Sequence, residues 1–262
     1  MIGTVTQVAR NISQPRGGYL NPRKMDWIQL SDGKELQEKE NVHASIVGMV
    51  VDYLTRLETE GDAEKAFEIS REGARIAQKV TGAEKEEEAR SYLENIQGLD
   101  ERSIVNACKL VTFDVWYRNP IAASLAKTAE QINPDEETVH NIRVMAERCR
   151  DFWRENGPIV KSGFTFEPDG YTGRIPAGDG DYLTKDTMWD LKVSKTPPKP
   201  QHTLQLLMYW SMGQHSGNPI FAGVKKIGIF NPRLHTVYTY DMTRFDPESL
   251  KYIEREIIGY SE

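Results

Sequence analysis

The sequence predicts an α/β protein with a helical first part and a strand-rich last part. Two observations support this fold class. Apolar residues recur at helical spacing through residues 41–156, and after Gly157-Pro158 short strand-like segments alternate with turns rich in Gly, Pro and Asp. Helices followed by strands in this order favour one α/β domain that carries a helical insertion or cap.

The first 156 residues divide into an arm and a helical region. Residues 1–40 mix short apolar runs with turn signals such as the QPRGGY sequence at 14–19, and we expect an N-terminal arm docked on the body of the protein. Residues 41–156 are expected to be helical, because apolar side chains recur every three or four positions in NVHASIVGMVVDYLTRLE and in three later segments. Those later segments cover residues 62–79, 100–118 and 135–156.

Residues 157–262 are expected to hold the sheet. Short apolar runs bounded by turn residues are typical of strands, and they occur at 160–166, 179–184, 188–194, 224–230 and 236–240. A helix is expected over 202–213, between the third and fourth of these strands. The sequence Asp246-Pro247-Glu248 is typical of a helix start, and a last helix is expected over 250–260.

Composition restricts the class of protein. Of the 262 residues, 39% are hydrophobic and 27% charged, which is typical of a globular protein, and no apolar run is long enough to predict a membrane span. Only two cysteines occur, Cys108 and Cys149, so we expect no disulfide framework and a reducing cytoplasmic location. A net charge of -6 argues against a protein that coats nucleic acid, but it leaves open an enzyme that acts on one.

The most informative segment is GDGDYLTKDTMWDLK, at residues 178–192. On a strand, Asp190 and Lys192 share one face. If the chain reverses between Lys185 and Asp186, Leu183 pairs with Met188, Tyr182 with Trp189, and Asp181 lies opposite Asp190. Two carboxylates and an ammonium group then converge. Such a group can bind Mg²⁺ or Mn²⁺ and stabilise the charge that develops when a phosphodiester is hydrolysed.

This order of residues resembles the PD-(D/E)xK nuclease superfamily. Two further features resemble its RecB-type branch: Gln205 and Tyr209 match a Q-x-x-x-Y motif on the helix after the lysine, and His43 starts a long upstream helix. The resemblance implies a restriction-endonuclease-like mixed sheet flanked by helices, with the nuclease core in residues 157–262 and a contribution from the helical region 41–156.

The resemblance also implies the roles of these residues. Asp181, Asp190 and the Leu191 carbonyl would bind Mg²⁺ or Mn²⁺, with His43 as a further metal ligand. Lys192 would be catalytic, and Gln205 and Tyr209 would contact the substrate or brace the site. The expected partner is nucleic acid, and DNA is favoured because that branch mostly acts on DNA. No membrane partner is expected.

Alternatives stay open at this point. Asp179 competes with Asp181 as the first carboxylate, since both lie on one face of the expected strand. Asp190 and Lys192 could be a structural ion pair. The chain could also be a catalytically silent nucleic-acid-binding or assembly protein, or an interaction module whose helical region is the working part. A phosphate-binding groove could be formed by the nearby basic residues, which are Lys195, Lys199, Lys225, Lys226 and Arg233.

Overall fold

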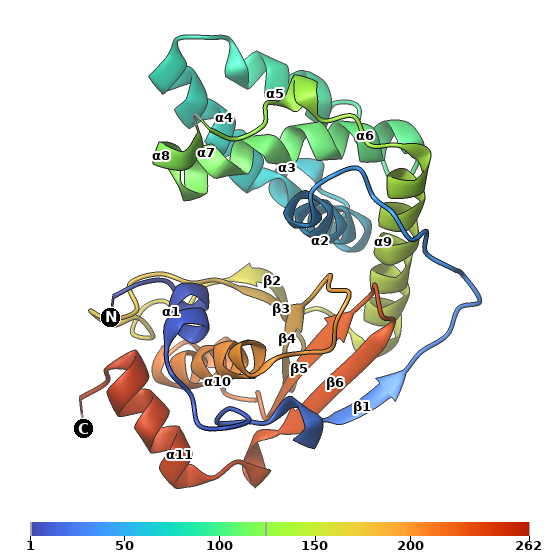
Figure 1. Cartoon of the computed structure of the whole chain (residues 1–262). Helices are drawn as coiled ribbons and strands as arrows, with labels where there is room; N and C mark the ends of the chain where they lie inside the picture. Colours follow the sequence, from blue (N-terminus) through green and yellow to red (C-terminus); the bar gives the residue numbers. More distant parts are fainter. Residues whose placement is uncertain (1, 124, 262) are drawn as a thin grey trace. The chain divides into compact units, whose positions relative to one another are not determined.

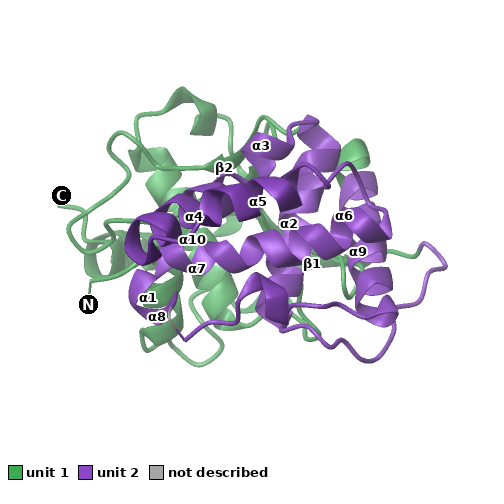
Figure 2. Ribbon diagram, turned by 90° about the horizontal axis from the view of Figure 1, so that it is seen from above, with its two compact units in different colours: residues 1–31, 153–262 green, residues 32–152 purple. Residues whose placement is uncertain are grey.

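The computed structural model describes residues 2–123 and 125–261, which form two compact units (Figures 1 and 2). Unit 1 contains residues 1–31 and 153–262, and unit 2 contains residues 32–152. The N-terminal arm is therefore divided: its first part packs with the strand-rich half of the chain. In the described part of the chain, no helix is long and apolar enough to cross a membrane.

Unit 1 is built on a six-stranded mixed sheet in the order β1-β6-β5-β4-β3-β2. All neighbours are antiparallel except β4 and β5, which are parallel and joined through α10. The elements of this unit are α1 (Val5–Asn11), β1 (Asp26–Gln29), β2 (Lys161–Phe164), β3 (Gly180–Leu183), β4 (Thr187–Leu191), α10 (Pro200–His215), β5 (Lys226–Asn231), β6 (Thr236–Asp241), α11 (Pro247–Tyr252) and a π-helical segment (Ile253–Ile258).

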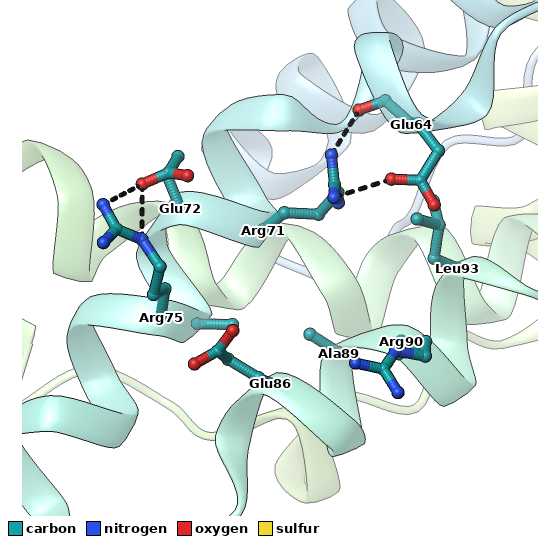
Figure 3. A pocket seen from close by; sticks show the side chains of 9 residues that line it. Glu64, Arg71, Glu72, Arg75, Glu86, Ala89, Arg90 and Leu93 are labelled. Atoms are coloured by element: carbon teal, nitrogen blue, oxygen red, sulfur yellow. Dashed lines mark hydrogen bonds and ion pairs between the residues drawn. The ribbon is translucent and has the colours of Figure 1, made fainter.

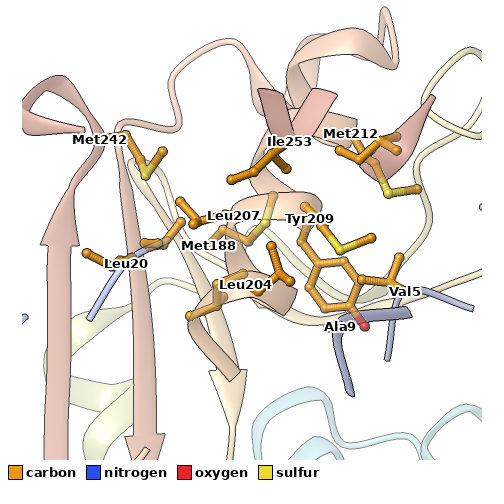
Figure 4. Packing of buried hydrophobic residues seen from close by; sticks show 14 of the residues in the cluster. Val5, Ala9, Leu20, Met188, Leu204, Leu207, Tyr209, Met212, Met242 and Ile253 are labelled. Atoms are coloured by element: carbon orange, nitrogen blue, oxygen red, sulfur yellow. The ribbon is translucent and has the colours of Figure 1, made fainter. Parts of the chain in front are cut away.

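The α/β class and the five strands predicted after Gly157-Pro158 are confirmed, and β1 supplies a sixth strand from the arm. One face of the sheet packs against α10, α1 and the C-terminal helical segment. Figure 4 shows Leu204 and Leu207 of α10 beside Met188 of β4, with Val5 and Ala9 of α1 near Tyr209. All of these side chains are buried, so α10 is held firmly on the sheet.

The opposite face of the sheet is covered near β3 and β4 by the end of a long helix. Trp153 lies against Tyr182, with ring centroids 4.6 Å apart, and meets Trp189 edge-on at 5.9 Å. The Trp189 indole also donates to Thr184 Oγ1 at 3.1 Å. Trp189 is therefore a core residue.

Unit 2 is helical, as its apolar periodicity predicts. Its elements are α2 (Ala44–Glu60), α3 (Ala63–Ala66), α4 (Glu68–Thr81), α5 (Lys85–Leu93), α6 (Glu101–Leu110), α7 (Asp114–Arg118), α8 (Pro120–Ala123) and α9 (Glu136–Asn156), whose last residues belong to unit 1. The segment before α2 is tied to α9 by Arg148, whose Nε donates to Asp32 Oδ2 at 2.8 Å.

Candidate active site

Strand β4 carries the Asp-x-Lys pair into a buried position. Asp190 is only 2% exposed and Lys192, just after the strand, is 24% exposed at its side chain. The Lys192 N–H donates to Phe230 O at 3.0 Å, which keeps this residue alongside β5. Its Nζ lies 2.8 Å from Asp190 Oδ1. The alternation along β4 therefore brings the carboxylate and the ammonium group together on the face that α10 covers.

Gln205 of α10 contacts both members of this pair. Its Nε2 donates to Asp190 Oδ1 at 3.1 Å, and its Oε1 accepts from Lys192 Nζ at 3.3 Å. The amide orientation is fixed, because reversing it would set two donors together at Lys192 and two acceptors together at Asp190. Gln205 thus closes a triangle of hydrogen bonds that holds the ion pair in one geometry.

Tyr209 extends this network by one helical turn. Gln205 Nε2 also donates to the Tyr209 hydroxyl at 3.1 Å. Burial, and then the negative charges of Asp181 and Asp190, raise the pKa of Tyr209, so the phenol stays protonated. Gln205 is 6% exposed and Tyr209 is 4% exposed. Side chains this deeply buried are well placed to brace the site and poorly placed to touch a substrate.

Asp181 reaches the same place from β3. The predicted hairpin register is confirmed for Tyr182 with Trp189 and for Leu183 with Met188. Past these two pairs, β3 and β4 are joined by a hydrogen bond to a side chain. The Leu191 N–H of β4 donates to Asp181 Oδ2 of β3 at 2.7 Å. The Asp181 carboxylate therefore meets the backbone at the end of β4. The position of Asp181 directly opposite Asp190 stays a prediction, because the recorded register covers only the two pairs given above.

A glycine precedes Asp181 for a packing reason. Gly180 pairs with Phe164 of β2, and a Cβ on Gly180 would lie 2.1 Å from the Phe164 ring. Phe164 is buried against Phe166 and Phe221, so its ring has little room to move. The absence of a side chain at Gly180 therefore leaves room for the Phe164 ring beside β3, just before Asp181.

The two members of the ion pair, Lys192 and Asp190, have different surroundings. Burial disfavours the charged form of Lys192, but the carboxylates of Asp190 and Asp181 outweigh it and raise the pKa of Lys192. Lys192 is therefore a cation at neutral pH. On Asp190, Oδ1 accepts two hydrogen bonds, whereas no described residue donates to Oδ2, which is also buried.

This donor set is consistent with a hard divalent cation. Proteins bind Mg²⁺ through one or two carboxylates, with water and phosphate oxygens completing the shell. Asp190 Oδ2 is a buried oxygen of the required type, and Asp181 accepts from the N–H of the next residue, Leu191. Within the described ranges, no group of three or more His, Cys, Asp or Glu is placed to bind a metal ion. The remaining ligands would have to be the Leu191 carbonyl, water and substrate.

Two other candidates stand apart from this cluster. Asp179, the alternative first carboxylate, is exposed before the start of β3 and is no part of the hydrogen-bonded network described above. His43 belongs to unit 2, where its Nδ1 accepts from the Ser45 N–H at 3.2 Å and caps α2. The role of His43 as a metal ligand stays a prediction.

His202 lies close enough to Lys192 and Asp190 for both charges to influence it, and the motif did not include it. It lies on α10 three positions before Gln205, so the two side chains share a helix face. Burial, then the positive charge of Lys192, lower the pKa of His202, while Asp190 opposes the shift. The helical spacing 202, 205, 209 is visible in the sequence and could have identified this histidine.

Unit 2 has a polar pocket of its own between α4 and α5 (Figure 3). It measures about 170 Å³, and each of its three arginines pairs with a glutamate: Arg71 with Glu64, Arg75 with Glu72, and Arg90 with Glu87. These are exposed pairs of the kind common on helix surfaces. Of the predicted site residues, Asp181, Asp190, Lys192, Gln205 and Tyr209 lie in unit 1, and His43 lies in unit 2.

No model of a known protein family, no curated protein and no solved structure matches this chain.

Proposed function

We propose that the protein is a metal-dependent nuclease of restriction-endonuclease-like fold that hydrolyses phosphodiester bonds in DNA. The observation that carries the proposal is the arrangement around Asp190. One of its oxygens is held by Lys192 and Gln205, and the other is buried without a hydrogen-bond donor among the described residues. A carboxylate that serves only a structural ion pair would have both oxygens satisfied.

The roles of the residues follow from their geometry. Asp181 and Asp190 would hold Mg²⁺ or Mn²⁺, which would lower the pKa of water and neutralise charge on the phosphate. Hydrolysis would form a bond from the water oxygen to phosphorus and break one P–O ester bond. The water would give up a proton to solvent, and the leaving oxygen would take one up from solvent. Lys192 is a cation, so it can orient the water and stabilise negative charge on the phosphate, but it cannot serve as the base. Gln205 and Tyr209 keep Lys192 and Asp190 in place.

The topology supports the same proposal. The hairpin of β3 and β4 delivers Asp181 and the Asp-x-Lys pair, and α10 then returns across the sheet to the parallel strand β5. Gln205 and Tyr209 lie on that connecting helix in the order that the RecB-type resemblance implies. The ends of β3 and β4 and the helix α10 thus contribute side chains to one face of the sheet.

The proposal is tested with a cleavage assay on linear duplex DNA, circular single-stranded DNA and RNA, each with Mg²⁺ or Mn²⁺. Wild type is compared with Asp190→Ala and Lys192→Ala. Matched controls come from the turn of the same hairpin: Asp186→Ala and Lys185→Ala remove the same side-chain types from exposed positions. We expect a loss of at least about 1000-fold in the two site variants only, because electrostatic stabilisation of the transition state is lost.

Equal cleavage by the wild type and both site variants would exclude this site. Nucleic-acid binding without cleavage in any metal would favour a silent binding protein of the same fold. Cleavage of the circular DNA, which has no ends, would show endonuclease action.

A further inference from the structure

The two oxygens of Asp190 have different partners. Oδ1 lies 2.8 Å from Lys192 Nζ and accepts from Gln205 Nε2 at 3.1 Å. Oδ2 is buried, and no described residue donates a hydrogen bond to it. The Asp190 carboxylate therefore has one oxygen that is occupied and one oxygen that can still bind a cation.

Lys192 is the neighbouring cation that could also take the second oxygen. Its ammonium group carries three donors at the end of a flexible stem, and its side chain is 24% exposed. In the described part of the chain, this ammonium has two hydrogen-bond partners, Asp190 Oδ1 and Gln205 Oε1. An ammonium that moved to Oδ2, or bridged both oxygens, would repel a metal ion that approaches the same carboxylate.

Gln205 restrains the ammonium group on the Oδ1 side. Its Oε1 accepts from Lys192 Nζ at 3.3 Å, and its Nε2 donates to Asp190 Oδ1. Both contacts come from one planar amide, so Lys192 cannot leave Oδ1 without losing the contact to Gln205. The amide is itself held in place, because Gln205 is 6% exposed and Nε2 also donates to the Tyr209 hydroxyl.

We propose that Gln205 is a positioning residue that confines the Lys192 ammonium to Oδ1 of Asp190 and so keeps Oδ2 available for Mg²⁺ or Mn²⁺. This inference rests on the nuclease function proposed above. Asp190 then contributes a single oxygen to the metal. Because Gln205 acts through Lys192, its contribution to metal binding should disappear when Lys192 is removed.

Mn²⁺ binding separates this role from simple packing, because it is measured without cleavage. Free Mn²⁺ is followed by electron paramagnetic resonance in titrations of wild type, Gln205→Met and Gln205→Ala, each with and without Lys192→Ala. Both changes at Gln205 remove the amide, but only methionine keeps a long side chain. The matched control is Gln214→Met, which removes an exposed glutamine near the end of the same helix. Unfolding in urea is measured for every variant.

We expect both Gln205 variants to raise the Kd for Mn²⁺ by about tenfold or more, as for the loss of an outer partner of a metal ligand. In the Lys192→Ala background, the same two changes should alter the Kd by less than about twofold, because the group that Gln205 restrains is gone. Gln214→Met should bind Mn²⁺ as wild type does.

Two results would overturn the inference while the proposed function stands. In the first, wild type binds Mn²⁺ and Gln205→Met binds it equally well, so that any loss in Gln205→Ala comes from packing. In the second, the change at Gln205 weakens binding as much without Lys192 as with it. If wild type neither binds Mn²⁺ nor cleaves DNA, the proposed function fails and this inference fails with it.

Discussion

Two aspartates, one in each unit, are equally buried and differ in how their oxygens are satisfied. Asp114 of α7 and Asp190 of β4 are both 2% exposed. The oxygens of Asp114 accept from the Tyr53 hydroxyl at 2.6 Å and from the Ser70 hydroxyl at 2.5 Å. On Asp190 both observed hydrogen bonds go to Oδ1, and no described residue donates to Oδ2.

The difference supports the proposal that Asp114 is a structural carboxylate and that Asp190 binds a ligand. Burial raises the pKa of Asp114, and the Ser70 and Tyr53 hydroxyls oppose this shift by stabilising the ionised form. Each of its oxygens has a partner, so the group contributes to the stability of unit 2. Asp190 keeps a desolvated oxygen, which costs stability unless a ligand uses it. Two aspartates with the same exposed fraction therefore differ in what their burial does to stability.

The largest expected effect is on stability. Asp114→Ala would leave the Tyr53 and Ser70 hydroxyls buried without their acceptor, and we expect it to lower the free energy of unfolding by about 3 kcal/mol. Asp190→Ala should lower it by less than half as much, because Lys192 is partly exposed and keeps its contact with Gln205. Urea titration of both variants measures the difference.

The same pair of variants should behave oppositely in cleavage. Asp114→Ala is expected to cleave DNA normally at temperatures where it stays folded, whereas Asp190→Ala should be inactive. A stability loss in Asp190→Ala as large as in Asp114→Ala would show that Asp190 is mainly structural.

A smaller effect is expected from Tyr209→Phe. This change removes only the hydroxyl that accepts from Gln205 Nε2, so Gln205 keeps its contacts with Asp190 and Lys192 but can shift. We expect kcat to fall about tenfold with KM unchanged, as for the loss of an outer partner of a catalytic group. A rise in KM with constant kcat would instead place Tyr209 in contact with the substrate.

The smallest effect concerns the thiols of unit 2. Cys108 and Cys149 are fully buried, and burial raises the pKa of Cys108 to about 12. Because the thiolate is the reactive form, neither should react with a thiol reagent in the folded protein at neutral pH. Both should react after denaturation in guanidinium. Rapid labelling of the native chain would mean that the interior of unit 2 opens readily, unlike the closed core that surrounds Asp114.

Much of the site could be predicted because it depends on local periodicity. Period-two alternation places Asp190 and Lys192 on one face of β4, and the short polar turn fixes the pairing of Leu183 with Met188. Helical spacing places Gln205 and Tyr209 together. His202 follows the same spacing, but a motif search passes over it because the motif begins at Gln205.

Other features depend on contacts between distant parts of the chain. The strand β1 joins the sheet by pairing with β6, which is more than 200 residues away in the sequence. A strand needs a hydrogen-bonding partner, and β1 finds one only when the sheet has folded. Likewise, Gly180 is explained only by the ring of Phe164 packed against it.

The sequence by itself determined the elements: helices over most of residues 41–156, strands after Gly157-Pro158, and the residue types that can bind a metal. These elements can be read from the sequence because the helix and strand periods involve residues only a few positions apart. Only the tertiary structure decided which oxygens are satisfied. Hydrogen bonds such as those of Gln205 to Asp190 and Lys192 join residues 13 to 15 positions apart, and they depend on how α10 packs on the sheet. Whether a buried carboxylate is structural or available to a ligand is therefore a property of the packed molecule.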